Sequence, residues 1–292
     1  MRQAIVLESD THGGQKFGLM DPAVKLPKLD IIVDDLGFAS LETSYYTPEA
    51  TQGQLELWAL RNTNIDRIKS ILSNYGKVVY IHNGDLTQGT KHPAALVSTR
   101  QADQILIAAA NLRPIFDIDE IKIIRFSSGT EAHNFGQGSS DIEVAEILKK
   151  EYPKKNMMVY NHGFATLEDD FTVDYAHHGP HPGSRSWLSG NVARFYLRDI
   201  MMQRVARGLK PPDLVVRSHF HQPIIETVRH AGYTSNIVIT PSMCLVDDHT
   251  LQSVRSPETV TCGMMMADVV DGKLLDIHQF TKTFNMLQEE RL

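Results

Sequence analysis

Short apolar runs alternate with longer amphipathic segments through the first two thirds of the chain. The apolar runs have the length of buried strands, and they predict strands over 2–8, 77–81, 121–126 and 214–216. The amphipathic segments predict helices over about 52–75, 97–112, 139–150 and 187–208. A strand pair is expected over 157–160 and 171–176.

The last third of the chain is dominated by strand patterns. Strands are predicted over 236–239, 259–270 and 274–280, and Asp271-Gly272 is typical of a two-residue hairpin turn. The connections between the early strands are long enough for helical crossovers, so those strands are expected to be parallel. Together these elements predict an α/β fold with two facing mixed β-sheets flanked by helices.

The segment from about 13 to 50 follows neither pattern. It is interrupted by Gly13-Gly14, Pro22, Pro27 and Pro48, and it is long for a loop in a compact domain. We therefore predict an irregular insertion inside a single domain that spans 1–292. The sequence has no internal repeat and no evident domain boundary.

The composition bears on the class and cellular location of the protein but does not indicate a function. The formal net charge is −6, which gives no overall electrostatic case for nucleic-acid binding, although a local basic groove would not be visible in that sum. Cys244 and Cys262 are the only cysteines, too few for a disulfide framework. No run reaches the roughly 18 apolar residues that a membrane span needs. We expect a soluble protein in the cytoplasm with no membrane partner.

Five clusters of Asp, Glu and His each follow an apolar run. They are Asp10-Thr11-His12, Asn83-Gly84-Asp85, Gly129-Thr130-Glu131-Ala132-His133, His177-His178-Gly179 and Ser218-His219-Phe220-His221. Carboxylates and imidazoles are ligands of divalent transition metals, and residues two apart on an extended segment point the same way. Because ligands gather at the carboxyl ends of parallel strands, the clusters predict one metal site. Taken singly, Asp10 and Asp85 are equally typical of turns and helix caps.

In order, these clusters resemble the motifs of the calcineurin-like metallophosphoesterase superfamily: D-x-H, G-D, G-N-H-[DE], a lone His before Gly, and G-H-x-H. The resemblance spans about 5–221 and implies a four-layer α/β sandwich. It also implies two divalent ions. Matched position by position, the ligands of the first ion are Asp10, His12 and His221, the bridging carboxylate is Asp85, and the ligands of the second ion include His178 and His219.

The third cluster departs from the family pattern. The family's Asn ligand and catalytic His would fall on Thr130 and Glu131, while His133 lies two residues further on. We expect Glu131 to bind the second metal and His133 to act as the general acid. His177 and His162 compete with His178 for the position of the lone His. The cluster is similar to one in phage-encoded members of the superfamily, which would place the protein in a host cytoplasm.

The resemblance implies hydrolysis of a phosphate ester by a hydroxide that bridges the two metals. Oxygen and nitrogen ligands suit Mn, Fe, Zn or Ni, and we favour Mn. A phosphodiesterase or nuclease, with a nucleic acid as substrate, is the preferred hypothesis. The alternatives are a phosphomonoesterase and a non-catalytic scaffold that keeps the fold. Asn83 and Arg185 are candidate substrate-binding residues, although a turn role for Asn83 and a solvated position for Arg185 fit as well.

Overall fold

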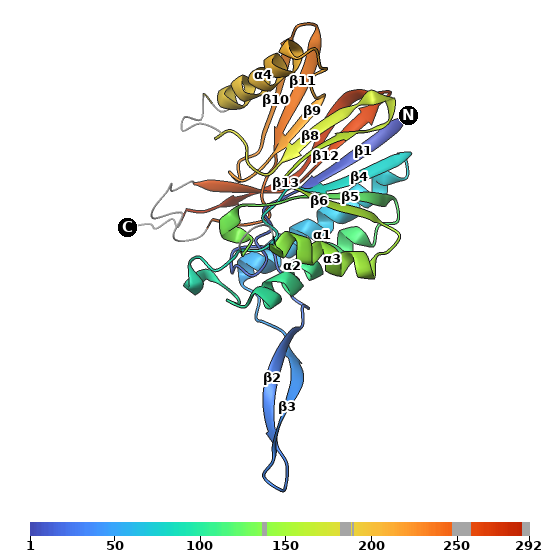
Figure 1. Ribbon diagram of the computed structural model, residues 1–292. Coiled ribbons are helices and arrows are strands. Elements are labelled where there is room, and N and C mark those ends of the chain that lie inside the picture. The colour runs from blue at the N-terminus through green and yellow to red at the C-terminus, as the bar shows by residue number, and fades with distance from the viewer. Residues whose placement is uncertain (136–138, 182–187, 189, 247–257, 288–292) are drawn as a thin grey trace, which may run out of the picture.

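Two β-sheets face each other in the computed structural model, which describes residues 1–135, 139–181, 188, 190–246 and 258–287. The six-stranded sheet has the order β13-β12-β1-β4-β5-β6, and the five-stranded sheet has the order β10-β11-β9-β8-β7. Helices cover the outer face of each sheet (Figure 1). The fold is therefore a four-layer α/β sandwich, as the sequence predicts.

The elements follow the apolar pattern closely. The strands of the six-stranded sheet are β1 (Arg2–Glu8), β4 (Lys77–His82), β5 (Ile121–Ser127), β6 (Asn156–Tyr160), β12 (Thr259–Val270) and β13 (Lys273–Asn285). Those of the five-stranded sheet are β7 (His162–Thr166), β8 (Thr172–Ala176), β9 (Leu214–Arg217), β10 (Ile224–His230) and β11 (Tyr233–Ile239). The helices are α1 (Gln52–Leu72), α2 (Gln101–Phe116), α3 (Ser139–Glu151) and α4 (Asn191–Ala206).

Strand direction follows the prediction for the early part of the chain. β1, β4, β5 and β6 are all parallel to their neighbours among these four strands. The β12–β13 hairpin turns at Asp271 and Gly272, which both have positive φ. The expected pairing of 157–160 with 171–176 is wrong, because β6 belongs to the six-stranded sheet and β8 pairs with β7 in the other.

Three apolar cores hold the layers together. The first lies between α1, α2, α3 and the six-stranded sheet, where Leu57 and Leu112 pack with strand residues such as Val6. The second lies between the sheets and joins residues such as Leu7 and Val216. The third packs α4 on the five-stranded sheet. Side chains alternate along β1, so this strand contributes to the first two cores at once.

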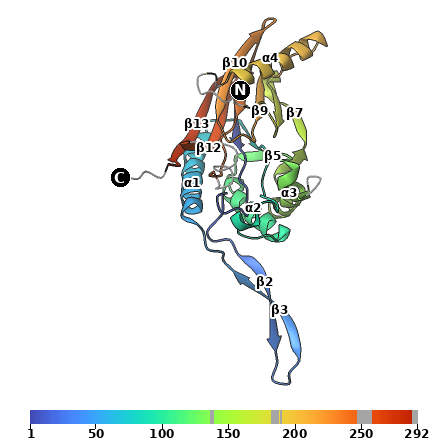
Figure 2. The same cartoon turned by 90° about the vertical axis from the view of Figure 1, so that its left-hand side faces the viewer.

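The segment expected to be irregular contains a long hairpin. β2 (Leu26–Val33) and β3 (Ala39–Tyr46) pair antiparallel along their whole length. The hairpin projects away from the body of the molecule in both views (Figures 1 and 2). The prediction failed because the prolines suggested loop structure, whereas Pro27 stands near the start of a strand that has a free edge, where proline is tolerated.

Among the described helices, none has the length and apolar character needed to cross a membrane.

Candidate metal centre

All five Asp and His clusters come together at one edge of the sandwich. They follow the carboxyl ends of β1, β4, β5, β8 and β9, which is where binding sites form in sheets with parallel strands. Three groups of closely spaced ligand atoms result: Asp10, His12 and His221; His12, Asp85 and His133; and Asp85, His177 and His219. Within each group, all ligand atoms lie within 4.8 Å of one another. His12 and Asp85 each belong to two groups, so the groups form one continuous centre.

The backbone at this centre is held in an uncommon conformation. Asp10, His12, Asp85, His219 and His221 all have positive φ, between 45° and 77°. For a residue with a side chain, such a conformation costs about 1–3 kcal/mol, and it persists only where the surrounding structure enforces it. It turns successive side chains away from the strand direction and toward a common point. These five residues are Asp and His residues of the centre itself.

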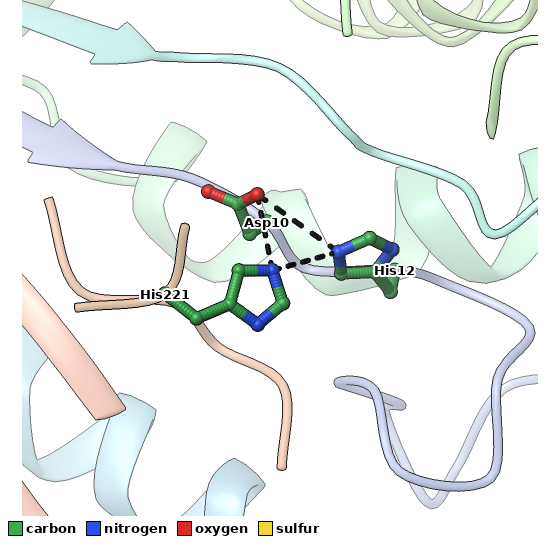
Figure 3. A group of neighbouring side chains, drawn as sticks. All are labelled: Asp10, His12 and His221. Carbon is green, nitrogen blue, oxygen red and sulfur yellow. Dashed lines mark hydrogen bonds and ion pairs between the residues drawn. The ribbon is translucent and has the colours of Figure 1, made fainter. Parts of the chain in front are cut away.

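The first group converges on a single point. Figure 3 shows the rings of His12 and His221 turned toward the same oxygen of Asp10. His221 Nε2 lies 3.2 Å from Asp10 Oδ1, and His12 Nε2 lies 3.9 Å from it. The two Nε2 atoms are 3.2 Å apart. A positive charge among them, either a proton on one ring or a metal ion, would stabilise two imidazole nitrogens and a carboxylate oxygen this close.

Asp85 connects the remaining ligands. Its Oδ2 atom lies 3.0 Å from Nε2 of His177 and 4.0 Å from Nε2 of both His12 and His133. Its other oxygen accepts the Thr130 main-chain N–H at 2.6 Å. One carboxylate oxygen is thus fixed by the protein and the other faces the imidazoles. This is the geometry required of a carboxylate shared between two ions.

The protonation states suit metal binding. The pKa of Asp10 and that of Asp85 are raised by burial, but neighbouring histidines lower both by more, so both carboxylates are ionised at neutral pH. Burial, with a further contribution from the neighbouring imidazoles, lowers the pKa of His12 to about 3 and that of His219 to about 4. Neutral imidazole and ionised carboxylate are the forms that coordinate a metal.

The pKa of His177 is shifted in the opposite direction from those of His12 and His219. Burial lowers its pKa, but Asp85 and Asp10 outweigh burial and raise it to about 10. The two buried carboxylates are therefore stabilised by a positive charge at this position. A protonated His177 ring or a bound metal ion would supply that charge.

Two buried polar atoms at the centre fit the donor set of a cation site. Among the described residues, Asp10 Oδ1 and His177 Nε2 make no hydrogen bond of good geometry, although each has a close neighbour, His221 Nε2 at 3.2 Å and Asp85 Oδ2 at 3.0 Å. Buried polar groups are nearly always hydrogen-bonded in native proteins, and a cation at this point would satisfy both atoms. Both lie at the centre of the cluster, and the nearest charged atoms around them are the carboxylates and imidazoles described above.

Contacts behind the ligands orient the rings. His177 Nδ1 lies 2.6 Å from the main-chain oxygen of Asn83, which can only accept, so Nδ1 carries the proton and Nε2 faces the centre. A Cβ at Gly84 would lie 2.5 Å from that same Nδ1, so this position excludes a side chain. Likewise, a Cβ at Gly129 would lie 2.2 Å from Asp85 Oδ1.

The third cluster is arranged differently from the expectation. Thr130 Oγ1 lies 3.3 Å from both Asp85 Oδ2 and His219 Nδ1, so this side chain belongs to the centre. Glu131 is exposed and belongs to none of the three groups. Glu131 begins a 3₁₀ turn, and His133, at the end of the same turn, belongs to a ligand group.

The lone-histidine position also differs. The structure brings His177, which is buried, into the ligand groups, whereas His178 is exposed and stands beside them with its ring 4.8 Å from that of His219. His162 lies on β7 and bonds Asp174 at 2.8 Å, so it belongs to a separate contact.

Of the two candidate substrate-binding residues, the structure describes only Asn83. Asn83 is fully buried; its amide nitrogen donates to Ala176 O and Ser218 Oγ, and its oxygen accepts from Ser127 Oγ. These bonds connect the ends of strands from both sheets, which is a structural role, and the substrate-binding role stays a prediction. Arg185 lies outside the described residues.

Sequence reasoning missed a second buried network beneath the centre. Glu8, the last residue of β1, accepts two hydrogen bonds from Arg61 of α1, at 2.6 and 3.0 Å, and one from Tyr80 at 2.6 Å. All three side chains are fully buried. Glu8 is two residues before Asp10, so this network fixes the strand end from which Asp10 and His12 project.

Comparisons with known proteins give only remote likenesses. No protein-family model matches the chain, and no curated protein matches it. Similar solved structures include the sulfate thiohydrolase SoxB of Thermus thermophilus, with a TM-score of 0.39 and 10% identity over 97% of this chain and 56% of that one. They also include the calcineurin-like phosphoesterase YfkN of Bacillus subtilis, with a TM-score of 0.38 and 11% identity over 97% and 90% of the two chains. This chain spans little more than half the length of SoxB.

Proposed function

We propose that this protein is a metal-dependent phosphoesterase of the calcineurin-like superfamily, with two divalent ions at the described centre. The observation that carries the proposal is the shared position of Asp85. Its Oδ2 atom lies 4.0 Å from His12 Nε2 and 3.0 Å from His177 Nε2. Asp85 belongs to two of the three ligand groups, one that includes His12 and one that includes His177.

The proposed ligands fall into two sets. Asp10, His12 and His221 hold the first ion, His177 and His219 hold the second, and Asp85 is common to both. Glu131 and His178 leave the ligand set in this proposal because neither belongs to a ligand group. Thr130 takes the family's Asn position, where its hydroxyl contacts both Asp85 and His219.

Two bound ions would neutralise the charge of a phosphoryl group and supply a hydroxide nucleophile at neutral pH. Mn is our preferred metal, since the donors are all nitrogen and oxygen. The chain's own contribution is to hold the ester in line with that nucleophile and to protonate the leaving oxygen.

His133 is the proposed proton donor. Its Nδ1 lies 2.6 Å from the main-chain oxygen of Gln88, so Nδ1–H donates there and fixes the ring. This leaves Nε2 facing the centre, 4.0 Å from Asp85 Oδ2. A protonated Nε2 can give its proton to the departing oxygen, and it returns to the acid form by taking a proton from water.

We propose a phosphodiester as the substrate, with a nucleic acid as the natural source. Esters of ordinary alcohols have poor leaving groups, so they benefit most from a positioned acid such as His133, and the backbone of a nucleic acid is a diester of this kind.

The test compares bis-p-nitrophenyl phosphate, p-nitrophenyl phosphate and single-stranded DNA as substrates of the Mn-loaded protein. We expect diester and DNA cleavage that Asp85→Asn abolishes and Asp30→Asn, a remote change of the same type, leaves intact. Turnover of the monoester alone would contradict the phosphodiesterase proposal and favour a phosphomonoesterase. Little bound metal, together with no turnover of any of the three substrates, would favour the scaffold hypothesis.

A further inference from the structure

The β2–β3 hairpin has one apolar face and one polar face. Directly opposite residues of an antiparallel pair share a face. The apolar face consists of four such pairs: Pro27 with Tyr45, Leu29 with Thr43, Ile31 with Leu41, and Val33 with Ala39. The opposite face carries Lys28 with Ser44, Asp30 with Glu42, and Ile32 with Ser40.

Contacts on the polar face confirm this division. Lys28 Nζ lies 2.8 Å from Asp30, and the Ser44 hydroxyl donates to the same carboxylate. Lys28, Asp30 and Ser44 therefore bond one another within the polar face. The apolar face carries no charged side chain, and one hydroxyl, that of Thr43, is its only polar side-chain group apart from the phenol of Tyr45.

The apolar face is open to solvent along its length. Leu29, Ile31, Val33, Leu41 and Tyr45 are 61–72% exposed. Soluble monomers rarely expose apolar patches larger than a few hundred Å², and larger ones mark interaction sites. Within the described part of the chain, the hairpin packs on the body at its base, where Leu26 is fully buried in a small core with α2 residues such as Ile107.

A hairpin of this kind is incomplete as a folding unit. A two-stranded ribbon is at best marginally stable in water, and it needs further strands or a second packed layer. In Figures 1 and 2 the hairpin projects from the body, and among the described residues the body gives it no packed layer beyond its base. A second molecule could supply this layer.

We propose that the apolar face of this hairpin is a dimerisation surface, covered by the same face of a second copy of this chain. A two-fold axis brings identical patches together, and a patch without charge meets its copy without burying any charge. The two ribbons then form a small four-stranded sandwich, with their charged faces outward. Two copies would bury on the order of 1,000 Å² in total, close to the smallest stable interfaces.

Charge argues against a lipid surface as the occupant. The hairpin carries Asp30, Asp34, Asp35 and Glu42 against a single Lys28. Asp34 and Asp35 stand at the tip, the part that would enter a membrane first. An anionic surface repels such a tip, whereas face-to-face pairing of two copies leaves the acidic groups at the ends and outside.

The experiment is light scattering after size exclusion, with the full chain loaded at about 100 µM, where a micromolar dimer is fully assembled. We expect a dimer for the wild type and for Ile32→Glu, which places the charge on the polar face. Ile31→Glu, one residue away on the apolar face, should raise the dissociation constant at least tenfold. Metal content and far-ultraviolet circular dichroism check that both variants are folded.

Three outcomes would overturn the proposal: a monomeric wild type, a dimer that survives Ile31→Glu, or equal weakening by the two variants. Flotation with neutral and anionic vesicles separates the lipid alternative. Binding to vesicles that Ile31→Glu abolishes, together with a monomeric wild type, would assign the face to a membrane instead.

Discussion

His177 Nε2 lies 3.0 Å from Asp85 Oδ2, while Nδ1 of the same ring donates to the main-chain oxygen of Asn83 at 2.6 Å. The donor bond fixes the tautomer, and it leaves the second nitrogen for the centre. The ring of His177 is therefore oriented by Asn83, a residue 94 positions away in the sequence. Its neighbour His178 has no such contact with Asn83.

The two adjacent histidines should respond differently to truncation. We expect His177→Ala to lose one of the two bound ions and most hydrolysis, because it removes a buried ligand. His178→Ala, the matched control, should keep both ions. Metal analysis of the two dialysed variants makes the comparison. Loss of an ion in His178→Ala only would restore the ligand assignment made from the sequence.

The role of His133 is tested by leaving groups. Because an acid is needed most when the leaving group is poor, we expect His133→Asn to lose about 10²–10⁴-fold in kcat with a DNA substrate. The loss with a p-nitrophenyl diester should be much smaller, since that leaving group departs without a proton. A uniform loss accompanied by reduced metal content would instead make His133 a ligand.

Much of the centre could be predicted because each ligand follows an apolar strand. Asp10, Asp85 and His219 stand directly after β1, β4 and β9, and the alternation of strands with helical crossovers brings such ends to one edge. The residue types at these ends then limit the chemistry to oxygen and nitrogen ligands. None of this requires knowledge of long-range contacts.

The remainder depends on contacts between distant segments. The orientation of the His177 ring depends on the Asn83 carbonyl, and the exposure of Glu131 could not be read from the residues around it. Positive φ at Asp10 and Asp85 is enforced by the folded surroundings, since neither residue type requires it. The β2–β3 hairpin was missed because the prolines of this segment suggested loop structure, whereas Pro27 lies near the start of a strand with a free edge.

The third cluster yields a further contrast between neighbours. Thr130 contacts Asp85 and His219, so we expect Thr130→Val to weaken binding of the second ion by about 10–100-fold. Glu131→Gln should leave metal affinity unchanged because that side chain is exposed. Titration calorimetry with Mn measures both. Weaker binding in Glu131→Gln alone would return the ligand role to Glu131.

The network beneath the centre is expected to matter for stability. Arg61→Met leaves the Glu8 carboxylate buried without its partner, which costs about 3–5 kcal/mol in the free energy of unfolding. The double variant Glu8→Gln with Arg61→Met removes both charges, so it should recover much of that loss. Urea unfolding of the three proteins gives the values. A double variant no more stable than Arg61→Met would show that the arginine acts through packing and not through charge.

Metal stoichiometry tests the central claim most directly. The dialysed protein is equilibrated with Mn and its bound metal is measured by mass spectrometry, beside Asp85→Asn and the remote control Asp30→Asn. We expect about two ions per chain in the wild type and the control, and fewer in Asp85→Asn, because its carboxylate is common to both sites. One ion or none in the wild type, or an unchanged content in Asp85→Asn, would contradict a two-metal centre built around Asp85.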